Sequence, residues 1–149
     1  MTYPRNEVVA VLAGVTCRAG AVRPDGTVRL SRKGPTPPND PRFSYDEKWD
    51  LWETVVPVDA CDLLVEINSF ARYRGAPCQV MSIGDDGRAL VYYTGDNGAE
   101  AEKNGFEQTD PGTYSTIVPV GELFDYHEIH RDLLFERWRA RSFGEAVHR

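Results

Sequence analysis

The most informative absence in this sequence of 149 residues is that of a long hydrophobic run. A membrane-spanning helix needs about 20 consecutive apolar residues, and the apolar stretch at residues 8–15 is much shorter. The residues before it are polar, so we expect neither a membrane span nor a secretion signal. Basic surface is also scarce: the net charge is −6, whereas general binders of nucleic acid or anionic membranes carry basic surfaces. We therefore expect a cytoplasmic protein that binds neither nucleic acid nor membranes.

Catalytic and cofactor-binding motifs are missing as well. The sequence contains no nucleophile elbow, phosphate-binding loop or dinucleotide-binding glycine pattern. This favours a protein that is not an enzyme and holds no cofactor. Lysine is rare, with 3 lysines against 14 arginines, a bias typical of GC-rich bacterial genomes. The hydrophobic content of 41% is ordinary, so a packed core is expected.

An internal repeat is the clearest positive feature. Residues 54–58 are Thr-Val-Val-Pro-Val and residues 116–120 are Thr-Ile-Val-Pro-Val, an offset of 62. Upstream, Cys17 matches Cys78 at an offset of 61, together with an Asp-Gly pair in each copy. Two blocks in the same order indicate a duplication. Because the two cysteines are equivalent, we predict that both are small hydrophobic core residues, with a disulfide or a zinc site as the alternatives.

Short strands separated by turns dominate the predicted structure. The predicted strands are residues 7–13, 17–22, 27–31, 45–58, 78–83, 88–94 and 113–120. Asp-Gly at residues 25–26 and 86–87 predicts turns, because glycine supplies the positive φ that they need. A helical turn is expected at residues 59–64 and a short helix at residues 99–104, ended by a glycine. The proline of each repeated motif marks a strand end or edge.

Residues 122–141 form the one long predicted helix, because apolar side chains recur there at intervals of three and four. His127 and His130 lie within it, three residues apart, and could share a metal ion with an acidic neighbour such as Glu128. The interval differs from the four-residue spacing of zinc proteases. A hydrogen-bonded structural histidine is the alternative interpretation of His130, which falls inside the apolar stripe.

Two further stretches could carry function. Four prolines in residues 32–42 exclude a helix or a central strand, so we predict an exposed loop that either connects two strands or binds a partner. Asp59, Asp62 and Glu66 would share one face of a helical turn. They could act as paired catalytic carboxylates, and acids on a solvated surface are the simpler interpretation.

Both copies have the order hairpin, variable loop, strand, Pro-Val and helical turn. This order resembles the small SH3-like β-barrel, in which short bent strands close on themselves and a helical turn precedes the last strand. The resemblance covers about residues 8–67 and 70–129. It implies a mainly β protein with a C-terminal α-helix and two barrel-like repeats packed together, at residues 1–68 and 69–149. One shared sheet or sandwich in a single compact domain would give the same sequence pattern.

Negative charge is concentrated in the second copy. Residues 85–110 hold seven acids against two bases, a net charge of −5. Charge of one sign steers association with a basic partner, and nearby aromatic side chains could add contact area. A solvated surface and aromatic core packing are the alternatives. The residues predicted to bind a partner are Asp96, Glu100, Glu102, Glu107, Asp110, Tyr92 and Trp49.

This profile is similar to that of immunity proteins from bacterial toxin systems, which sequester a toxin domain, frequently a basic nuclease, by covering its active site with acidic surface. The similarity implies a non-catalytic inhibitor with a protein partner and no cofactor. Two other classes stay open. One is a small enzyme or metal protein that uses His127 and His130 in a cleft between the repeats. The other is a regulatory module that binds a peptide or a small ligand.

Overall fold

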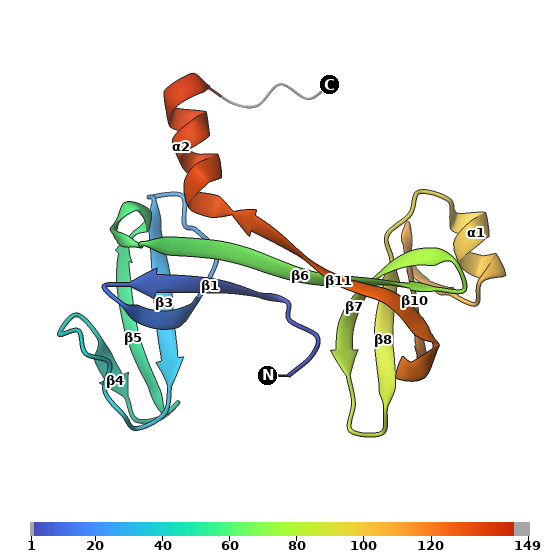
Figure 1. The fold of residues 1–149 in the computed structure, drawn as a ribbon, viewed down its shortest axis with the longest axis horizontal. Helices are drawn as coiled ribbons and strands as arrows, with labels where there is room; N and C mark the ends of the chain where they lie inside the picture. Colours follow the sequence, from blue (N-terminus) through green and yellow to red (C-terminus); the bar gives the residue numbers. More distant parts are fainter. Residues whose placement is uncertain (1, 145–149) are drawn as a thin grey trace. The chain divides into compact units, whose positions relative to one another are not determined.

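The computed structural model of the chain describes residues 2–144. The fold is mainly β, with 52% strand and 16% helix. Its strands form an antiparallel sheet and are followed by a C-terminal helix, α2 (Leu133–Phe143), which confirms the predicted mainly β class (Figure 1). Among the described residues, no helix has the length and apolar character that a membrane crossing requires.

The chain folds into two compact units, each assembled from two separate parts of the sequence. Within the described residues, the first unit comprises residues 7–66 and 130–144, and the second comprises residues 2–6 and 67–129. Strands β6 (Leu63–Tyr73) and β11 (Leu123–Asp132) each contribute residues to both units and pair with each other. Residues 2–6 therefore belong with the second copy of the repeated motif, and α2 belongs with the first.

The first unit contains five strands in the spatial order β4-β5-β3-β2-β1. Their bounds are β1 (Glu7–Leu12), β2 (Val15–Ala19), β3 (Thr27–Lys33), β4 (Ser44–Asp46) and β5 (Leu51–Pro57), each antiparallel to its neighbours. The predicted turn at Asp25-Gly26 joins β2 to β3. Gly26 has a φ of +83° and donates its N–H to the carbonyl of Arg23 over 2.9 Å, which confirms the hairpin.

Alternation along the strands builds the core of the first unit. In β3, Val28 and Leu30 are fully buried, whereas Arg29 between them is exposed. Side chains from β1, β2, β5 and β6 complete the same cluster. Leu133 and Leu134, at the start of α2, pack against it, so the C-terminal helix covers part of this core.

The second unit contains strands in the spatial order β6-β7-β8-β10-β9. Its elements are β7 (Ala76–Ile83), β8 (Arg88–Tyr93), α1 (Gly98–Lys103), β9 (Glu107–Asp110) and β10 (Thr113–Pro119). The predicted turn at Asp86-Gly87 joins β7 to β8, and Gly87 has a φ of +76°. The core cluster of this unit includes Val80, Val91 and Phe106.

Two elements of the first unit, β5 and the 3-10 turn after it, have counterparts 62 residues later in the second unit. β5 and β10 both end in a motif proline and continue into a 3-10 turn, η1 (Val58–Ala60) or η2 (Val120–Glu122). The residue after each proline donates its N–H to a hairpin glycine, from Val58 to Gly26 over 2.9 Å and from Val120 to Gly87 over 2.8 Å. Proline has no N–H, and it stands at the end of the strand in both units, as predicted.

All three cysteines are buried and free. Cys17 and Cys78 are 5% and 0% exposed, which confirms the prediction that they are core residues. Burial raises the pKa of each thiol, and that of Cys78 to about 11. A neutral thiol is a poor nucleophile and a poor metal ligand, so these side chains serve to fill the core.

The predicted helix at residues 122–141 is wrong over its first half. Residues 123–132 are strand β11, and only α2 is helical. Aromatic and β-branched residues such as Phe124 and Ile129 favour strand, and pairing with β6 satisfies backbone groups that a helix would otherwise satisfy internally. The helix begins at Leu133, and Asp132 caps it with a side chain that accepts a hydrogen bond from the N–H of Phe135 at 2.9 Å.

The structure differs from two further predictions in the region from β3 to β5. The strand expected over residues 45–58 is interrupted at Asp50, which has a φ of +50°, so β4 and β5 form a hairpin. The proline-rich loop at residues 32–42 is not wholly exposed, because Pro38 and Asp40 within it are buried. The hydrogen-bonded guanidinium of Arg42, with Nη2 2.7 Å from Oδ2 of Asp40, holds the pKa of that carboxyl at about 2.

Candidate interaction surface

Residues 95–110, called the acidic segment from this point, connect β8 to β10 in the second unit. They form a turn, α1 and the edge strand β9. The side-chain oxygen of Asn97 caps α1 by accepting hydrogen bonds from the N–H groups of Ala99 and Glu100, at 3.1 and 3.2 Å. Gly105, with a φ of +91°, ends the helix as predicted. The local sequence thus determines both ends of α1.

An aromatic cluster anchors the acidic segment to the core of the second unit. Phe106 is 2% exposed and packs edge-on to Tyr73, with 5.9 Å between ring centroids. It also contacts Tyr93 at 5.7 Å. Ala101, on the inner face of α1, is fully buried. The segment is therefore held at two points, on α1 and just before β9.

Hydrogen bonds and close packing hold the turn before α1. The hydroxyl of Tyr93 accepts a hydrogen bond from the N–H of Asn97 at 3.2 Å and donates one to Glu100 Oε1 at 3.3 Å. A Cβ atom added to Gly95 would collide with the ring and hydroxyl of Tyr93, and one added to Gly98 would collide with Tyr114. Only glycine fits at these two positions, because the tyrosine side chains pack directly against the backbone of the turn.

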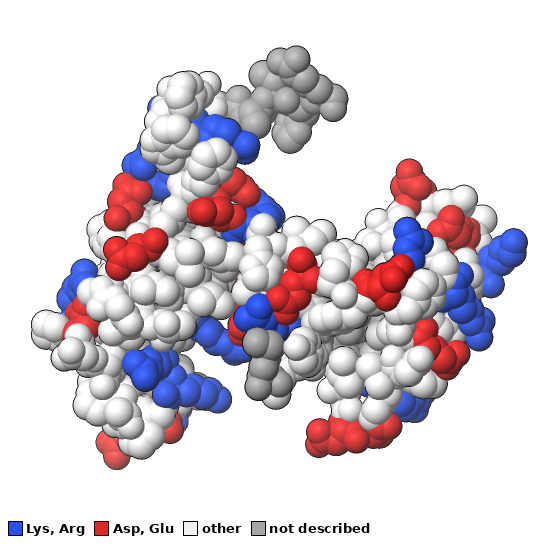
Figure 2. Space-filling view, in the orientation of Figure 1, with Lys and Arg blue, Asp and Glu red and all other residues white. Residues whose placement is uncertain are grey.

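The acids of the segment lie on its outside. All five predicted acidic binding residues are exposed, namely Asp96, Glu100, Glu102, Glu107 and Asp110. Within residues 2–144, none of the five forms an ion pair. Figure 2 shows red acidic side chains over the region of α1, with blue basic side chains among them. The structure thus places these carboxylates on the outside of one anchored segment, and the described residues hold none of them in an ion pair.

Nearly all of the net negative charge of the described residues belongs to the second unit. Its described residues contain ten acids and five bases, a net charge of −5, whereas those of the first unit contain twelve acids and eleven bases, a net charge of −1. Several acids of the first unit, such as Glu53 and Asp59, form ion pairs with arginines. The two units therefore differ in electrostatic character as well as in sequence.

A small hollow lies beside the acidic segment. Tyr93, Asp96, Asn97 and Tyr114 are among its lining residues, and its volume is about 220 Å³. Sites for small-molecule ligands are usually about 300–1,000 Å³, so this hollow has the size for a single side chain of a partner. The rings of Tyr93 and Tyr114 meet edge to face, with 6.3 Å between centroids.

The two aromatic residues predicted to bind a partner lie in different units. Tyr92, on β8, is 37% exposed and lies opposite Ser115 of β10, so it shares the second unit with the acidic segment. Trp49 is 62% exposed and lies in the turn between β4 and β5 of the first unit. The ammonium group of Lys48 lies 5.3 Å from its ring centroid.

The histidines do not have the geometry expected of them. Both lie on strand β11, where residues three apart point to opposite faces, so the helical argument for a shared metal fails. His127 stacks on Phe70 at 5.9 Å, and its Nδ1 lies 2.8 Å from the carbonyl oxygen of Asp125. His127 belongs to the second unit and His130 to the first. No group of three potential metal ligands occurs within residues 2–144.

The carboxylates proposed as an alternative catalytic set have separate partners. Asp59 binds Arg141, with Oδ2 2.8 Å from Nη1, and this hydrogen bond lowers the pKa of Asp59. Asp62 accepts a hydrogen bond from the N–H of Ala13 at 3.1 Å. Glu66 binds Arg131 over 2.8 Å. The three acids thus stabilise three different contacts.

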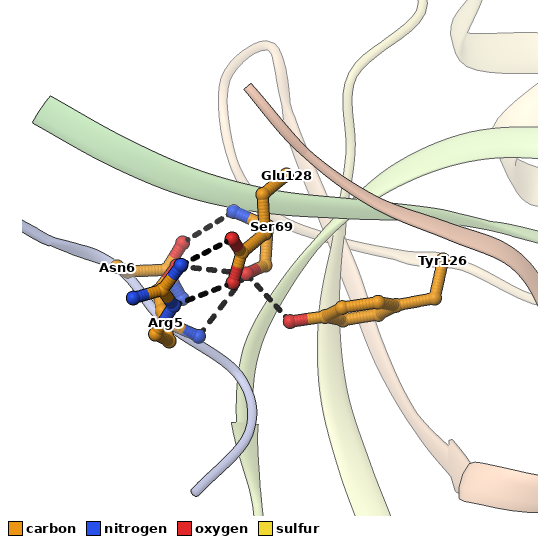
Figure 3. Close-up of polar contacts among 5 residues, drawn as sticks. All are labelled: Arg5, Asn6, Ser69, Tyr126 and Glu128. Atoms are coloured by element: carbon orange, nitrogen blue, oxygen red, sulfur yellow. Dashed lines mark hydrogen bonds and ion pairs between the residues drawn. The ribbon is translucent and has the colours of Figure 1, made fainter. Parts of the chain in front are cut away.

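A partly buried polar network, which the sequence did not indicate, joins residues 5–6 to β6 and β11 (Figure 3). Arg5 makes a two-pronged contact with Glu128, at 2.6 and 2.7 Å. Ser69 is fully buried. Its hydroxyl donates to the carbonyl of Arg5 at 2.7 Å and accepts from the N–H of Arg5 at 3.1 Å and from the hydroxyl of Tyr126 at 2.7 Å.

This network is structural. A serine hydroxyl has one proton and two lone pairs, and all three are used at Ser69, so it has no capacity left to act as a nucleophile. Glu66 and Glu128 lie 62 residues apart, which is the offset of the repeated motif, and this was the available sequence signal. Glu66 forms an ion pair with Arg131, and Glu128 forms one with Arg5. The two arginines come from opposite ends of the chain.

Comparisons with known proteins give no relative: no family model, no curated protein sequence and no solved structure matches this chain.

Proposed function

We propose that this is a non-catalytic binding protein of the immunity type, which sequesters a basic protein partner through its acidic segment. The observation that carries the proposal is the set of five exposed carboxylates without an ion pair in residues 2–144, on a segment anchored by Phe106. Surface carboxylates without counter-charges favour a complementary partner. The hollow beside Asp96 has room for one basic side chain of that partner.

Anchoring makes the surface suited to tight binding. A flexible acidic loop would lose conformational entropy on binding, at about 0.5–1.5 kcal/mol for each side chain that becomes ordered. The cap at Asn97 and the burial of Phe106 already restrict the backbone of the segment. Complementary charge also raises the association rate, in a way that salt suppresses.

The matched elements of the two units support the duplication expected from the sequence. The 62-residue offset extends from the motif to the 3-10 turns, and the hairpin glycines that accept the equivalent hydrogen bonds, Gly26 and Gly87, are offset by 61 residues. A duplicated scaffold with an SH3-like plan in each unit would let one copy diverge toward an acidic binding surface. The other copy would keep a near-neutral surface, consistent with its net charge of −1 over the described residues.

The test begins with capture of the tagged protein from a lysate of its source cells, and with measurement of the affinity for the partner that is recovered. Reversal of Asp96, Glu100 and Glu102 to lysine should weaken that affinity about 100-fold, if each lost charge pair contributes about 1 kcal/mol. The fold should be retained, because these side chains are exposed.

A matched control variant separates the effect of where the charges lie from the effect of the total net charge. Glu47, Asp85 and Glu122 are exposed acids outside the acidic segment, and their reversal to lysine changes the net charge by the same amount. This control should bind within about threefold of the unmodified protein. Equal losses in the two triple variants would show that overall charge, and not the acidic segment, governs binding.

A further inference from the structure

Strands β2 and β3 of the first unit pair with each other over only part of their length. The antiparallel ladder between them ends at the pair Arg18–Ser31. Beyond that pair, β2 continues along β1 as far as Val15, and β3 continues along β5 as far as Lys33. Each strand keeps its pairing on the other side, so the sheet opens between β2 and β3.

The main chain of Thr16 and Lys33 points into this opening. Gly20 donates its N–H to the carbonyl of Arg29 across the β2–β3 ladder at 2.9 Å. In an antiparallel ladder, every second residue directs its N–H and C=O groups toward the same neighbouring strand. Thr16 and Lys33 lie four residues from Gly20 and Arg29, so their polar groups are directed between β2 and β3. The ladder does not include either residue.

A pocket of about 660 Å³ occupies the opening, and it is called the β2–β3 pocket from this point. Small-molecule sites usually have volumes of about 300–1,000 Å³. Val9, Cys17 and Leu51 are lining residues that are buried or half-buried. Burial raises the pKa of the Cys17 thiol, so this side chain is neutral and the inner wall of the pocket is apolar.

Positive charge exceeds negative charge around the β2–β3 pocket. Its charged lining residues are three bases and one acid, Arg18, Arg32, Lys33 and Glu7. Arg18 and Glu7 neutralise each other, with Nη2 2.7 Å from Oε2. Within residues 2–144, Arg32 and Lys33 form no ion pair. An anionic group in the pocket would therefore lie near two cations that no acid neutralises.

The two cations stand at the point where β3 passes into the proline-rich loop. Their backbone is fixed, because Arg32 and Lys33 both pair with β5. Asp40, in the same loop, lies close enough for its charge to influence Cys17. The guanidinium of Arg42 holds that carboxylate at 2.7 Å, so Asp40 is not a counter-ion for Arg32.

We propose that the β2–β3 pocket binds a small ligand that joins an apolar body to an anionic oxygen group, either a carboxylate or a phosphate. The apolar body would contact the inner wall. The anionic group would accept hydrogen bonds from the side chains of Arg32 and Lys33 and from the N–H of Thr16. Hydrogen bonds between ionised groups are stronger than those between neutral groups. This site lies in the first unit and does not depend on the partner proposed for the acidic segment.

NMR of the backbone amides tests the proposal with the purified full chain. Benzoate, phenyl phosphate and inorganic phosphate are titrated separately at constant ionic strength. Benzoate or phenyl phosphate should shift the amide signals of Thr16 and Lys33, with a dissociation constant of about 1–10 mM. The probe that binds more tightly identifies the anionic group. Inorganic phosphate lacks an apolar body and should bind at least about tenfold more weakly than that probe.

Two double variants separate the pocket from the net charge. Arg32→Gln with Lys33→Gln should weaken binding of the better probe by about tenfold or more. Both side chains are exposed, so the fold should be retained, and the same amide spectra show whether it is. Arg23→Gln with Arg139→Gln is the matched control, because these arginines are exposed in the same unit outside the pocket. It should bind within about twofold of the unmodified protein.

Three results would overturn the proposal. The first is the absence of a shift at Thr16 and Lys33 with every probe. The second is an equal loss of affinity in the two double variants, because binding would then follow the net charge. The third is equal affinity for inorganic phosphate and for the better probe, which would show an adventitious ion only.

Discussion

Replacement of Phe106 by alanine should destabilise the second unit by about 3–5 kcal/mol, the range observed for large aromatic deletions in protein cores. The structure accounts for this magnitude in two parts. The side chain is 2% exposed, and burial of a phenylalanine contributes about 1.5–3 kcal/mol. Its contacts with Tyr73 and Tyr93 each add about 0.5–1.5 kcal/mol. The loss should also detach the acidic segment from its anchor.

Urea unfolding measures the stability, and amide hydrogen exchange at residues 98–110 measures local order. Ile117→Ala is the matched control, because Ile117 is 55% exposed on β10 of the same unit, and it should change stability by less than about 1 kcal/mol. In the Phe106→Ala variant, exchange in the acidic segment should be faster than in the control. A stability loss below about 1 kcal/mol for Phe106→Ala would refute the anchoring role.

Three further outcomes follow from buried groups. Ser69→Ala should destabilise the protein by about 1–3 kcal/mol in urea unfolding, because it removes the three hydrogen bonds that the buried Ser69 hydroxyl makes with Arg5 and Tyr126; an unchanged midpoint would contradict this. The folded-state pKa of Asp40 is about 2 against an ordinary value of 3.8, so its contribution to stability is present above the ordinary value and is lost as the pH falls through about 2. Asp40→Asn should flatten the acid side of the stability curve. Cys78, with a pKa raised to about 11 by burial, should react with a thiol reagent only on unfolding, and rapid labelling of the native protein would contradict its burial.

Local signals in the sequence were sufficient for turns, strand ends and the short helix. Gly26 and Gly105 both adopt the positive φ expected of them, because glycine alone reaches that conformation without a steric penalty. Pro57 ends its strand because it cannot donate to the ladder. The burial of Cys17 and Cys78 followed from their equivalence in the repeat. These features depend on a few neighbouring residues.

Features that depend on distant residues were not predictable in the same way. The stretch at residues 123–132 has an apolar spacing that fits a helix, but its backbone pairs with β6, which lies about 60 residues earlier. Short apolar periodicity cannot separate these outcomes. The contact of Arg5 with Glu128 spans 123 residues, and no local pattern indicates it. The candidate acids were identifiable from composition, whereas their anchoring by Phe106 required the fold.

The salt dependence of partner binding tests the role of the acidic segment most directly. Isothermal titration of the captured partner, at about 50 and about 500 mM salt, should show a marked loss of affinity for the unmodified protein, because salt screens exposed charges. The variant with Asp96, Glu100 and Glu102 reversed to lysine should bind weakly at both concentrations. If the unmodified protein and this variant have the same affinity and the same salt dependence, the acidic segment is not the binding surface.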